Sequence, residues 1–149
     1  MSDAAKNRQG EPRSVQLRRT DSTVFEATNE RGGAISIGAG DTELFTPVEL
    51  LLASISACSG IDVDMLTSRR AEPSDFQIEC TAMRVRDEQG NHLRDIDVKF
   101  TVTFPDGDDG DRARTMLPRA IEVSNDRLCT VSRTVALSSP VHMHAGDAS

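Results

Sequence analysis

The sequence predicts an α+β protein in which antiparallel sheets wrap around one long central helix. Two observations carry this prediction. Residues 46–70 hold a capped apolar run at helical spacing, and the stretches on either side alternate apolar and polar residues as strands do. The expected order is three strands, the long helix, two strands, a second helix and a final strand, with no internal repeat.

The composition is that of a small acidic protein with a thin core. Its 149 residues suit one ordinary domain or two small interlocked halves, and 24 acidic against 17 basic side chains give a net charge of −7. This charge argues against nucleic acid or an anionic membrane as a partner, because phosphate contacts need a basic face. Only 37% of the residues are hydrophobic and 3% are aromatic, so we expect burial against a second chain.

The start of the chain and its cysteines predict a cytoplasmic protein. Residues 1–12 are polar, are expected to form a disordered tail, and lack the apolar segment of a signal peptide. No stretch reaches the roughly 18 apolar residues that a membrane-spanning helix needs. The cysteines are three in number, which does not suit a secreted disulfide framework.

Residues 13–45 are expected to form short strands. Val15 and Leu17 alternate with polar neighbours, and two polar, turn-forming stretches separate them from apolar runs at residues 24–27 and 34–37. A set of hairpins of this size is marginal alone and needs cover on one face.

Residues 46–70 are predicted to form the central helix. Thr46 suits the cap, Pro47 the first helical position, and Glu49 the third position of a capping box. Apolar residues then recur on two neighbouring stripes, so most of the girth of the first four turns is apolar and the helix is expected to be buried. Its length would be about 36 Å at 1.5 Å per residue.

Residues 74–145 are expected to complete a single domain that spans residues 13–145. Strict alternation predicts two strands here, and a later amphipathic stretch follows an acidic loop. In chain order we expect a strand over residues 76–86, a strand over 93–104, a helix over 112–124, a short helical turn within 126–132 and a final strand over 141–145.

Cys58 and Cys129 are the candidate catalytic residues. Cys58 lies on the apolar stripe of the central helix among small neighbours. Cys129 lies where a loop enters a short helix, at which backbone N–H groups stabilise a thiolate, and Arg127 and Arg133 are close in sequence. For either thiol the alternative is a space-filling role, because free cysteine is often buried. Cys80, on the inward face of a strand, is expected to be structural.

Other motifs do not support a metal or a cofactor site. His142 and His144 share a face of the expected last strand, but two ligands are too few. The acidic loop at residues 105–111 fails the EF-hand pattern, and the glycines at 32–33 and 38–40 lack the context of a phosphate-binding loop. No triad order or elbow motif surrounds either candidate cysteine, so a Cys-His hydrolase also lacks support.

Two motifs together resemble a known family. They are TPVELLLASISACSGIDVDML and NDRLCTVSRTV, and the family is that of the OsmC/Ohr proteins, which are osmotically induced or confer organic hydroperoxide resistance. In this family a Pro-x-Glu-Leu-Leu-like start opens a long helix with one Cys, and a second Cys follows near the C-terminus. Here Pro47 lies 11 positions before Cys58, and Cys58 lies 71 positions before Cys129. The resemblance covers about residues 13–145.

The resemblance implies an OsmC-like fold in an intertwined homodimer, with active sites at the subunit interface. It also implies a peroxiredoxin-like thiol peroxidase that reduces organic hydroperoxides in the response to oxidative stress. Cys58 would attack the peroxide and become a sulfenic acid, and Cys129 would resolve it as a disulfide. A dithiol of the lipoamide type would then regenerate the enzyme, with no cofactor and no metal.

The chain departs from the family where support for the reactive thiol is expected. Peroxidase members place a Glu directly after the helix-opening Pro, whereas this chain has Val48 there and Glu49 one position later, about 100° around a helix. The family's thiolate-stabilising Arg comes from the N-terminal strands, where Arg18 and Arg19 are the nearest candidates and Arg31 lies behind them. The alternative function is an OsmC-fold protein with little peroxidase activity that binds a small apolar ligand at the dimer interface.

Overall fold

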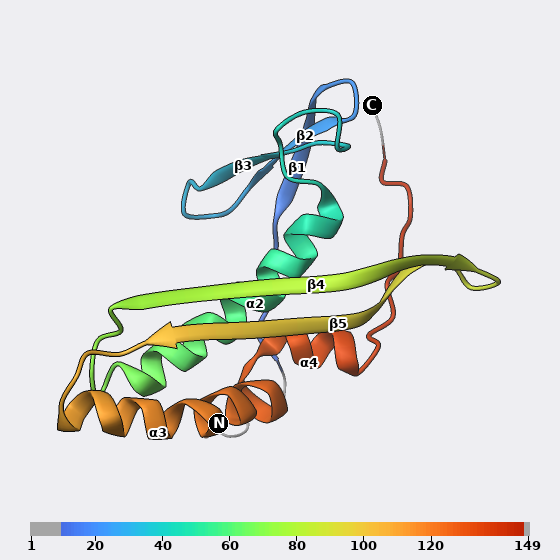
Figure 1. Ribbon diagram of the computed structural model, residues 1–149. Helices are drawn as coiled ribbons and strands as arrows, with labels where there is room; N and C mark the ends of the chain where they lie inside the picture. The colour runs from blue at the N-terminus through green and yellow to red at the C-terminus, as the bar shows by residue number, and fades with distance from the viewer. Residues whose placement is uncertain (1–9, 148–149) are drawn as a thin grey trace. The chain divides into compact units, whose positions relative to one another are not determined.

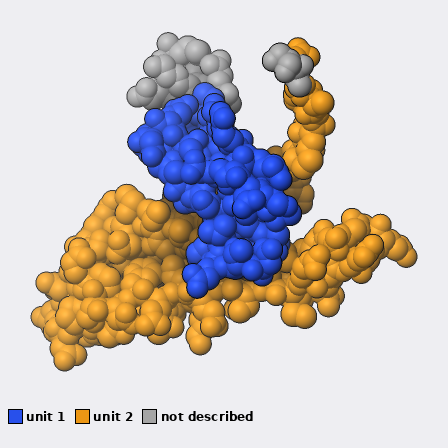
Figure 2. Space-filling model, turned by 90° about the horizontal axis from the view of Figure 1, so that it is seen from above, with its two compact units in different colours: residues 1–50 blue, residues 51–149 orange. Residues whose placement is uncertain are grey.

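The computed structural model describes residues 10–147 and divides the chain into two compact units (Figure 2). The first unit ends at Leu50 and the second begins at Leu51. Most of the expected tail, residues 1–9, lies outside the described residues, and a single domain over residues 13–145 stays a prediction. The elements, labelled in Figure 1, are β1 (Gln16–Asp21), β2 (Val24–Thr28), β3 (Ala34–Ile37), α2 (Pro47–Thr67), β4 (Asp75–Asp87), β5 (Gly90–Thr103), α3 (Asp108–Val123), η1 (Ser124–Leu128) and α4 (Thr130–Ala136).

Both sheets are antiparallel, which confirms the predicted α+β class. In the first unit β1, β2 and β3 form a three-stranded sheet in chain order. The turn between β2 and β3 is stabilised by Asn29, whose side-chain oxygen accepts hydrogen bonds from the N–H groups of Arg31 and Gly33 at 3.0 and 2.9 Å. The apolar side chains of this sheet are largely uncovered in the single chain, with Leu17 54% and Ile35 53% exposed.

The start of α2 follows the predicted capping box. The N–H of Glu49 donates to Oγ1 of Thr46 at 3.2 Å, and the Thr46 hydroxyl donates to the Glu49 carboxylate at 3.1 Å. The helix ends at Thr67, three residues earlier than expected, and residues 68–70 form a turn instead. Arg69 and Arg70 therefore lie beyond the helix rather than in its last turn.

Only one face of α2 is buried within the single chain. The buried residues are Ile55, Ser59, Gly60, Val63 and Thr67. The apolar side chains of Leu51, Ile61 and Met65 are 38%, 60% and 57% exposed, so the expectation of burial around most of the girth is wrong for one copy of the chain. The exposed apolar face is a surface of the kind that partners cover.

The expectation that no segment is apolar enough to span a membrane is also wrong for α2. The helix has 21 residues, and an 18-residue stretch within it has a mean hydropathy of 1.4, so it is long and apolar enough to cross a membrane by length and composition. One such helix is weak evidence, because the core helix of a soluble protein meets the same criteria.

The second unit packs α2 against a long two-stranded ribbon formed by β4 and β5 (Figure 1). The strands pair from Asp75 opposite Thr103 to Asp87 opposite Gly90, and exposed and half-buried side chains alternate over residues 75–83 and 96–103. Gly60 allows the close approach of α2, because a Cβ there would lie 2.6 Å from Cδ1 of Ile78.

The helical C-terminal part differs from the prediction at both of its ends. α3 begins at Asp108 rather than at residue 112, because acidic side chains of the expected loop form its first turn, where carboxylates are favourable. The expected strand over residues 141–145 is wrong: residues 139–147 have no regular secondary structure, and Val141 and Met143 are 77% and 90% exposed.

Replacement of Gly110 by alanine is expected to destabilise the protein by about 3 kcal/mol, because the new Cβ would overlap the carbonyl oxygen of Pro105 and force the loop before α3 to move. Urea unfolding measures the change. Gly146→Ala is the matched control, since a Cβ there meets nothing within 4 Å. Equal unfolding midpoints for the two variants would contradict this packing.

Candidate functional site

The two candidate cysteines, 71 positions apart in the chain, are neighbours in the second unit. The thiols of Cys58, on α2, and Cys129, between η1 and α4, lie close enough for each to shift the pKa of the other. Cys58 is half-buried, whereas Cys129 is 0% exposed, and both are free thiols. The structure therefore brings together a more accessible thiol and a fully enclosed one.

A turn of π-helix sets the position of Cys129. In η1 the N–H of Cys129 donates to the carbonyl oxygen of Ser124 at 2.9 Å, and Cys129 itself is extended, with φ −72° and ψ 100°. Its Sγ then caps α4 by accepting the N–H of Ser132 at 3.4 Å. Such π turns occur often at functional sites, because they redirect a side chain within an otherwise regular helix.

The surroundings shift the pKa values of the two thiols in opposite directions. Burial raises the pKa of Cys58, and the neighbouring Cys129 and Asp62 charges raise it further against a hydrogen bond from the Val131 backbone. Burial also raises the pKa of Cys129, but hydrogen bonds from the side chain and N–H of Ser132, from Cys58 and from Ser59 outweigh it, so the net pKa is lowered. When the pair carries one negative charge, that charge therefore rests on Cys129.

A buried polar cluster adjoins the cysteines and was missed by the sequence reasoning. The hydroxyl oxygens of Ser59 and Ser124 are 2.9 Å apart, and the Ser124 hydroxyl donates to Oδ2 of Asp62 at 2.9 Å. Ser59 is 7% and Ser124 0% exposed. The available signal was Asp62, a carboxylate one helical turn after Cys58 on a stripe that is otherwise apolar.

The other candidate residues lie in the first unit. Glu49 is exposed and caps α2, as the capping box predicted. Arg18 and Arg19 lie on β1 with exposed side chains, and Val48 is 42% exposed at the start of α2. Support of the thiolate by Glu49, Arg18 or Arg19 stays a prediction.

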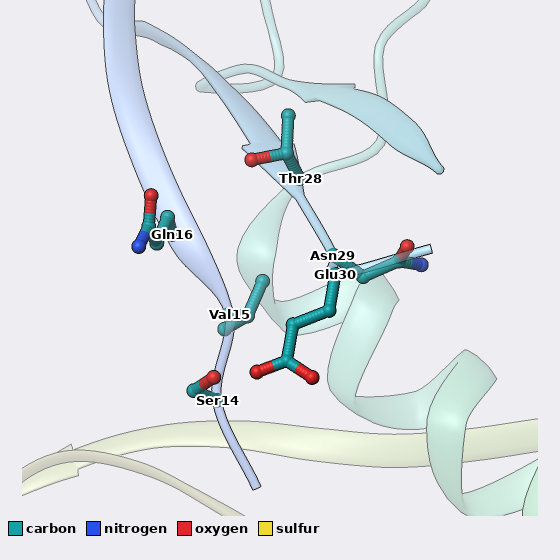
Figure 3. A pocket seen from close by; sticks show the side chains of 6 residues that line it. All are labelled: Ser14, Val15, Gln16, Thr28, Asn29 and Glu30. Carbon is teal, nitrogen blue, oxygen red and sulfur yellow. The ribbon is translucent and has the colours of Figure 1, made fainter. Parts of the chain in front are cut away.

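Two of the hollows among the described residues bear on where a ligand could bind. One in the first unit, of about 150 Å³, is lined by polar side chains around the β2–β3 turn and by the start of β1, and it contains no cysteine (Figure 3). The other, of about 360 Å³, is an open, mainly apolar groove on α2 and β4, and its lining includes Ala57, Ile61 and Phe76. Within residues 10–147, no group of three or more His, Cys, Asp or Glu side chains is placed to hold a metal ion.

Comparisons with known proteins agree on one family. A family model described as OsmC-like protein matches residues 39–144. An uncharacterized protein of Mycobacterium tuberculosis is 27% identical over 134 residues, which cover 88% of this chain and 94% of that protein.

Solved structures give the same fold. An OsmC-like protein of unknown function from Vibrio cholerae has a TM-score of 0.70 at 10% identity, covering 84% of this chain and 94% of that one. The organic hydroperoxide resistance protein OhrB of Bacillus subtilis has a TM-score of 0.50 at 17% identity, covering 81% and 90%. At these identities the similarity establishes the fold.

Replacement of Ser132 by alanine is expected to raise the pKa of Cys129, because the side-chain hydrogen bond of Ser132 stabilises the Cys129 thiolate. Ultraviolet absorbance of the thiolate, followed against pH in a Cys58→Ala, Cys80→Ala background, measures the shift. Thr134→Ala is the control, because its hydroxyl bonds only within α4, to the carbonyl of Thr130. A Cys129 titration that Ser132→Ala leaves in place would contradict the assignment.

Proposed function

The chain belongs to the OsmC-like protein family, and from that premise we propose that it is a thiol-dependent peroxidase that reduces organic hydroperoxides. One observation carries the proposal: Cys58 and Cys129 lie close enough for each thiol to shift the pKa of the other, although they come from separate elements of the second unit. Adjacent thiols of unequal exposure are the arrangement that a two-cysteine redox cycle needs.

The reaction consumes one hydroperoxide and oxidises both thiols. The sulfur of Cys58, the more accessible of the two, attacks the outer peroxide oxygen; the O–O bond breaks, and the leaving alkoxide takes up a proton to depart as alcohol. Cys58 is then a sulfenic acid. The thiolate of Cys129 attacks that sulfur, an S–S bond forms, the S–O bond breaks, and hydroxide leaves and becomes water. A dithiol reductant of the lipoamide type returns both residues to thiols by disulfide exchange.

The charge distribution of the pair supports a role for Cys129 in the first step. The Cys58 thiol has a raised pKa, so few Cys58 thiolates exist before substrate binds. The neighbouring Cys129, whose pKa is lowered, can accept the Cys58 proton while Cys58 attacks the peroxide. Cys129 would thus serve first as a base and then as the resolving nucleophile.

The exposed apolar face of α2 supports a homodimer. Ile61 and Met65 are more than half exposed on a helix whose opposite face is buried. A second copy of the chain is the partner that would cover this face and supply the burial that the thin core lacks. The odd number of cysteines fits a cytoplasmic setting, where thiols are kept reduced.

The apolar groove favours a second candidate function, the binding of a small apolar ligand with little peroxide turnover. The groove on α2 and β4 has about 360 Å³ and is lined mainly by apolar side chains. The raised pKa of Cys58 and the absence of the family's Glu at Val48 point the same way. Binding of an apolar probe that Cys58→Ser leaves unchanged, with no hydroperoxide consumption, would favour this candidate.

Replacement of Cys58 by serine is expected to reduce organic hydroperoxide consumption to the uncatalysed rate, because the attacking sulfur is lost. The assay follows hydroperoxide loss in the presence of excess dithiol. Cys80→Ser is the matched control and should retain activity, since Cys80 lies on β4 and pairs opposite Val98. Undiminished consumption by the Cys58→Ser variant would overturn the proposed function.

A further inference from the structure

Ser124 is hydrogen-bonded both to α2 and to Cys129. Its hydroxyl oxygen lies 2.9 Å from that of Ser59, and its hydroxyl donates to Oδ2 of Asp62 at 2.9 Å, so both side-chain bonds lead to α2. Its carbonyl oxygen accepts the N–H of Cys129 at 2.9 Å, the bond that closes the π turn η1. Through this one residue, the backbone of Cys129 is connected to α2.

The part of α2 that Ser124 contacts is the part that carries Cys58. Ser59 is the next residue in the chain, and Asp62 lies four positions after Cys58, about one helical turn away. The hydrogen bonds of Ser124 therefore place Cys129 near Cys58 rather than elsewhere along the helix. The effect of each thiol on the pKa of the other agrees with this proximity.

The two serine hydroxyls differ from the other buried polar side chain of the described residues. Within residues 10–147, the buried polar side chains are those of Ser59, Thr67 and Ser124. The Thr67 hydroxyl donates to the carbonyl oxygen of Val63 in its own helix at 2.9 Å, so it connects no two elements. Ser59 and Ser124 bond across elements. A buried polar pair of this kind favours one relative position, because any other would leave a hydroxyl without a partner.

We propose that Ser124 is a positioning residue, which holds Cys129 beside Cys58 for disulfide formation through its bonds to Ser59 and Asp62. This inference rests on the proposed function for its purpose, because the resolving step requires the Cys129 sulfur to reach the Cys58 sulfenic acid before a second hydroperoxide does. An unresolved sulfenic acid takes an oxygen from that hydroperoxide, which leaves as alcohol. Cys58 would then be a sulfinic acid, which disulfide exchange does not restore.

The hydrogen bonds of Ser124 matter most while the cysteines are reduced. In the oxidised protein the covalent S–S bond itself would keep the π turn beside α2. In the reduced protein only non-covalent contacts do so, and without the Ser124 hydroxyl the turn would gain other positions. Disulfide formation would then have to order this segment, and its equilibrium constant would fall.

The test measures how readily the two thiols form a disulfide in the absence of peroxide. Mixtures of reduced and oxidised glutathione set the redox potential in a Cys80→Ala background, and mass spectrometry of alkylated samples gives the fraction with a Cys58–Cys129 disulfide. The two thiols are oxidised as one glutathione disulfide is reduced to two glutathione thiols. We expect Ser124→Ala to lower the equilibrium constant about tenfold, the effect of one buried hydrogen bond.

Thr67→Val is the matched control, because it removes a buried hydroxyl that bonds only within α2, about 14 Å along the helix from Cys58. It should change the equilibrium constant less than about twofold, whatever it costs in stability. An equal fall in the two variants, or an unchanged constant in Ser124→Ala, would overturn the positioning role. So would the lack of any Cys58–Cys129 disulfide in the Cys80→Ala protein.

Ser59→Ala breaks the same connection from the side of α2. By itself it should also lower the constant, and it serves as the test if Ser124→Ala fails to fold, which far-ultraviolet circular dichroism reveals. In a Ser124→Ala background its effect should be less than about twofold, because its partner is already gone. An unchanged constant in Ser59→Ala, or equal effects in the two backgrounds, would overturn the proposal.

The titration separates this proposal from the proposed function. A tenfold fall in Ser124→Ala, in a protein that consumes no hydroperoxide, would support the positioning and remove only its catalytic purpose. An unchanged constant in a protein with hydroperoxide turnover would overturn the positioning role and leave the peroxidase in place.

Discussion

The packing of η1 against α2 is the contact on which the rest of the site depends. It places Cys129 beside Cys58, and the hydrogen bond between Ser59 and Ser124 fixes the position of η1 along α2. Both hydroxyls are buried, so a shift of either element would leave a polar group without a partner at a cost of about 1–3 kcal/mol. The polar cluster thus fixes the position of η1 relative to α2, which apolar packing alone would not determine.

In this contact Cys58 and Cys129 differ in exposure and in thiol pKa. Cys58 belongs to the body of a helix, is partly accessible and has a raised pKa, whereas Cys129 is enclosed and caps α4 with hydrogen bonds from Ser132 that lower its pKa. Cys58 is therefore the more accessible cysteine, and Cys129 is the more acidic one. In the proposed cycle Cys58 would meet the substrate and Cys129 would accept the proton, so that the cycle would use both properties.

The sequence predicted what depends on local patterns. The cap at Thr46, the alternating strands β4 and β5 and the α+β order follow from nearest neighbours and periodicity, and the paired cysteine motifs identified the OsmC/Ohr family that the family model confirms. The errors lie where two local structures compete for one segment, or where a strand depends on a partner far away in the sequence. Asp108 starts a helix where composition indicated a loop, and the expected strand over residues 141–145 has no partner strand among the described residues.

The cluster of Ser59, Asp62 and Ser124 could not be predicted for a different reason. Two of its members lie on α2 and the third begins a π turn more than 60 positions later, so no local period connects them. The proximity of Cys58 to Cys129 is of the same long-range kind. The sequence predicted both cysteines as candidate catalytic residues, but it does not give the distance between them.

Peptide mapping of the reduced protein after one equivalent of an organic hydroperoxide tests whether Cys58 and Cys129 form a redox pair. A two-cysteine cycle predicts the loss of two free thiols and a disulfide-linked pair of peptides that contain Cys58 and Cys129, with Cys80 still free. Retention of all three thiols, or a disulfide that involves Cys80, would contradict it.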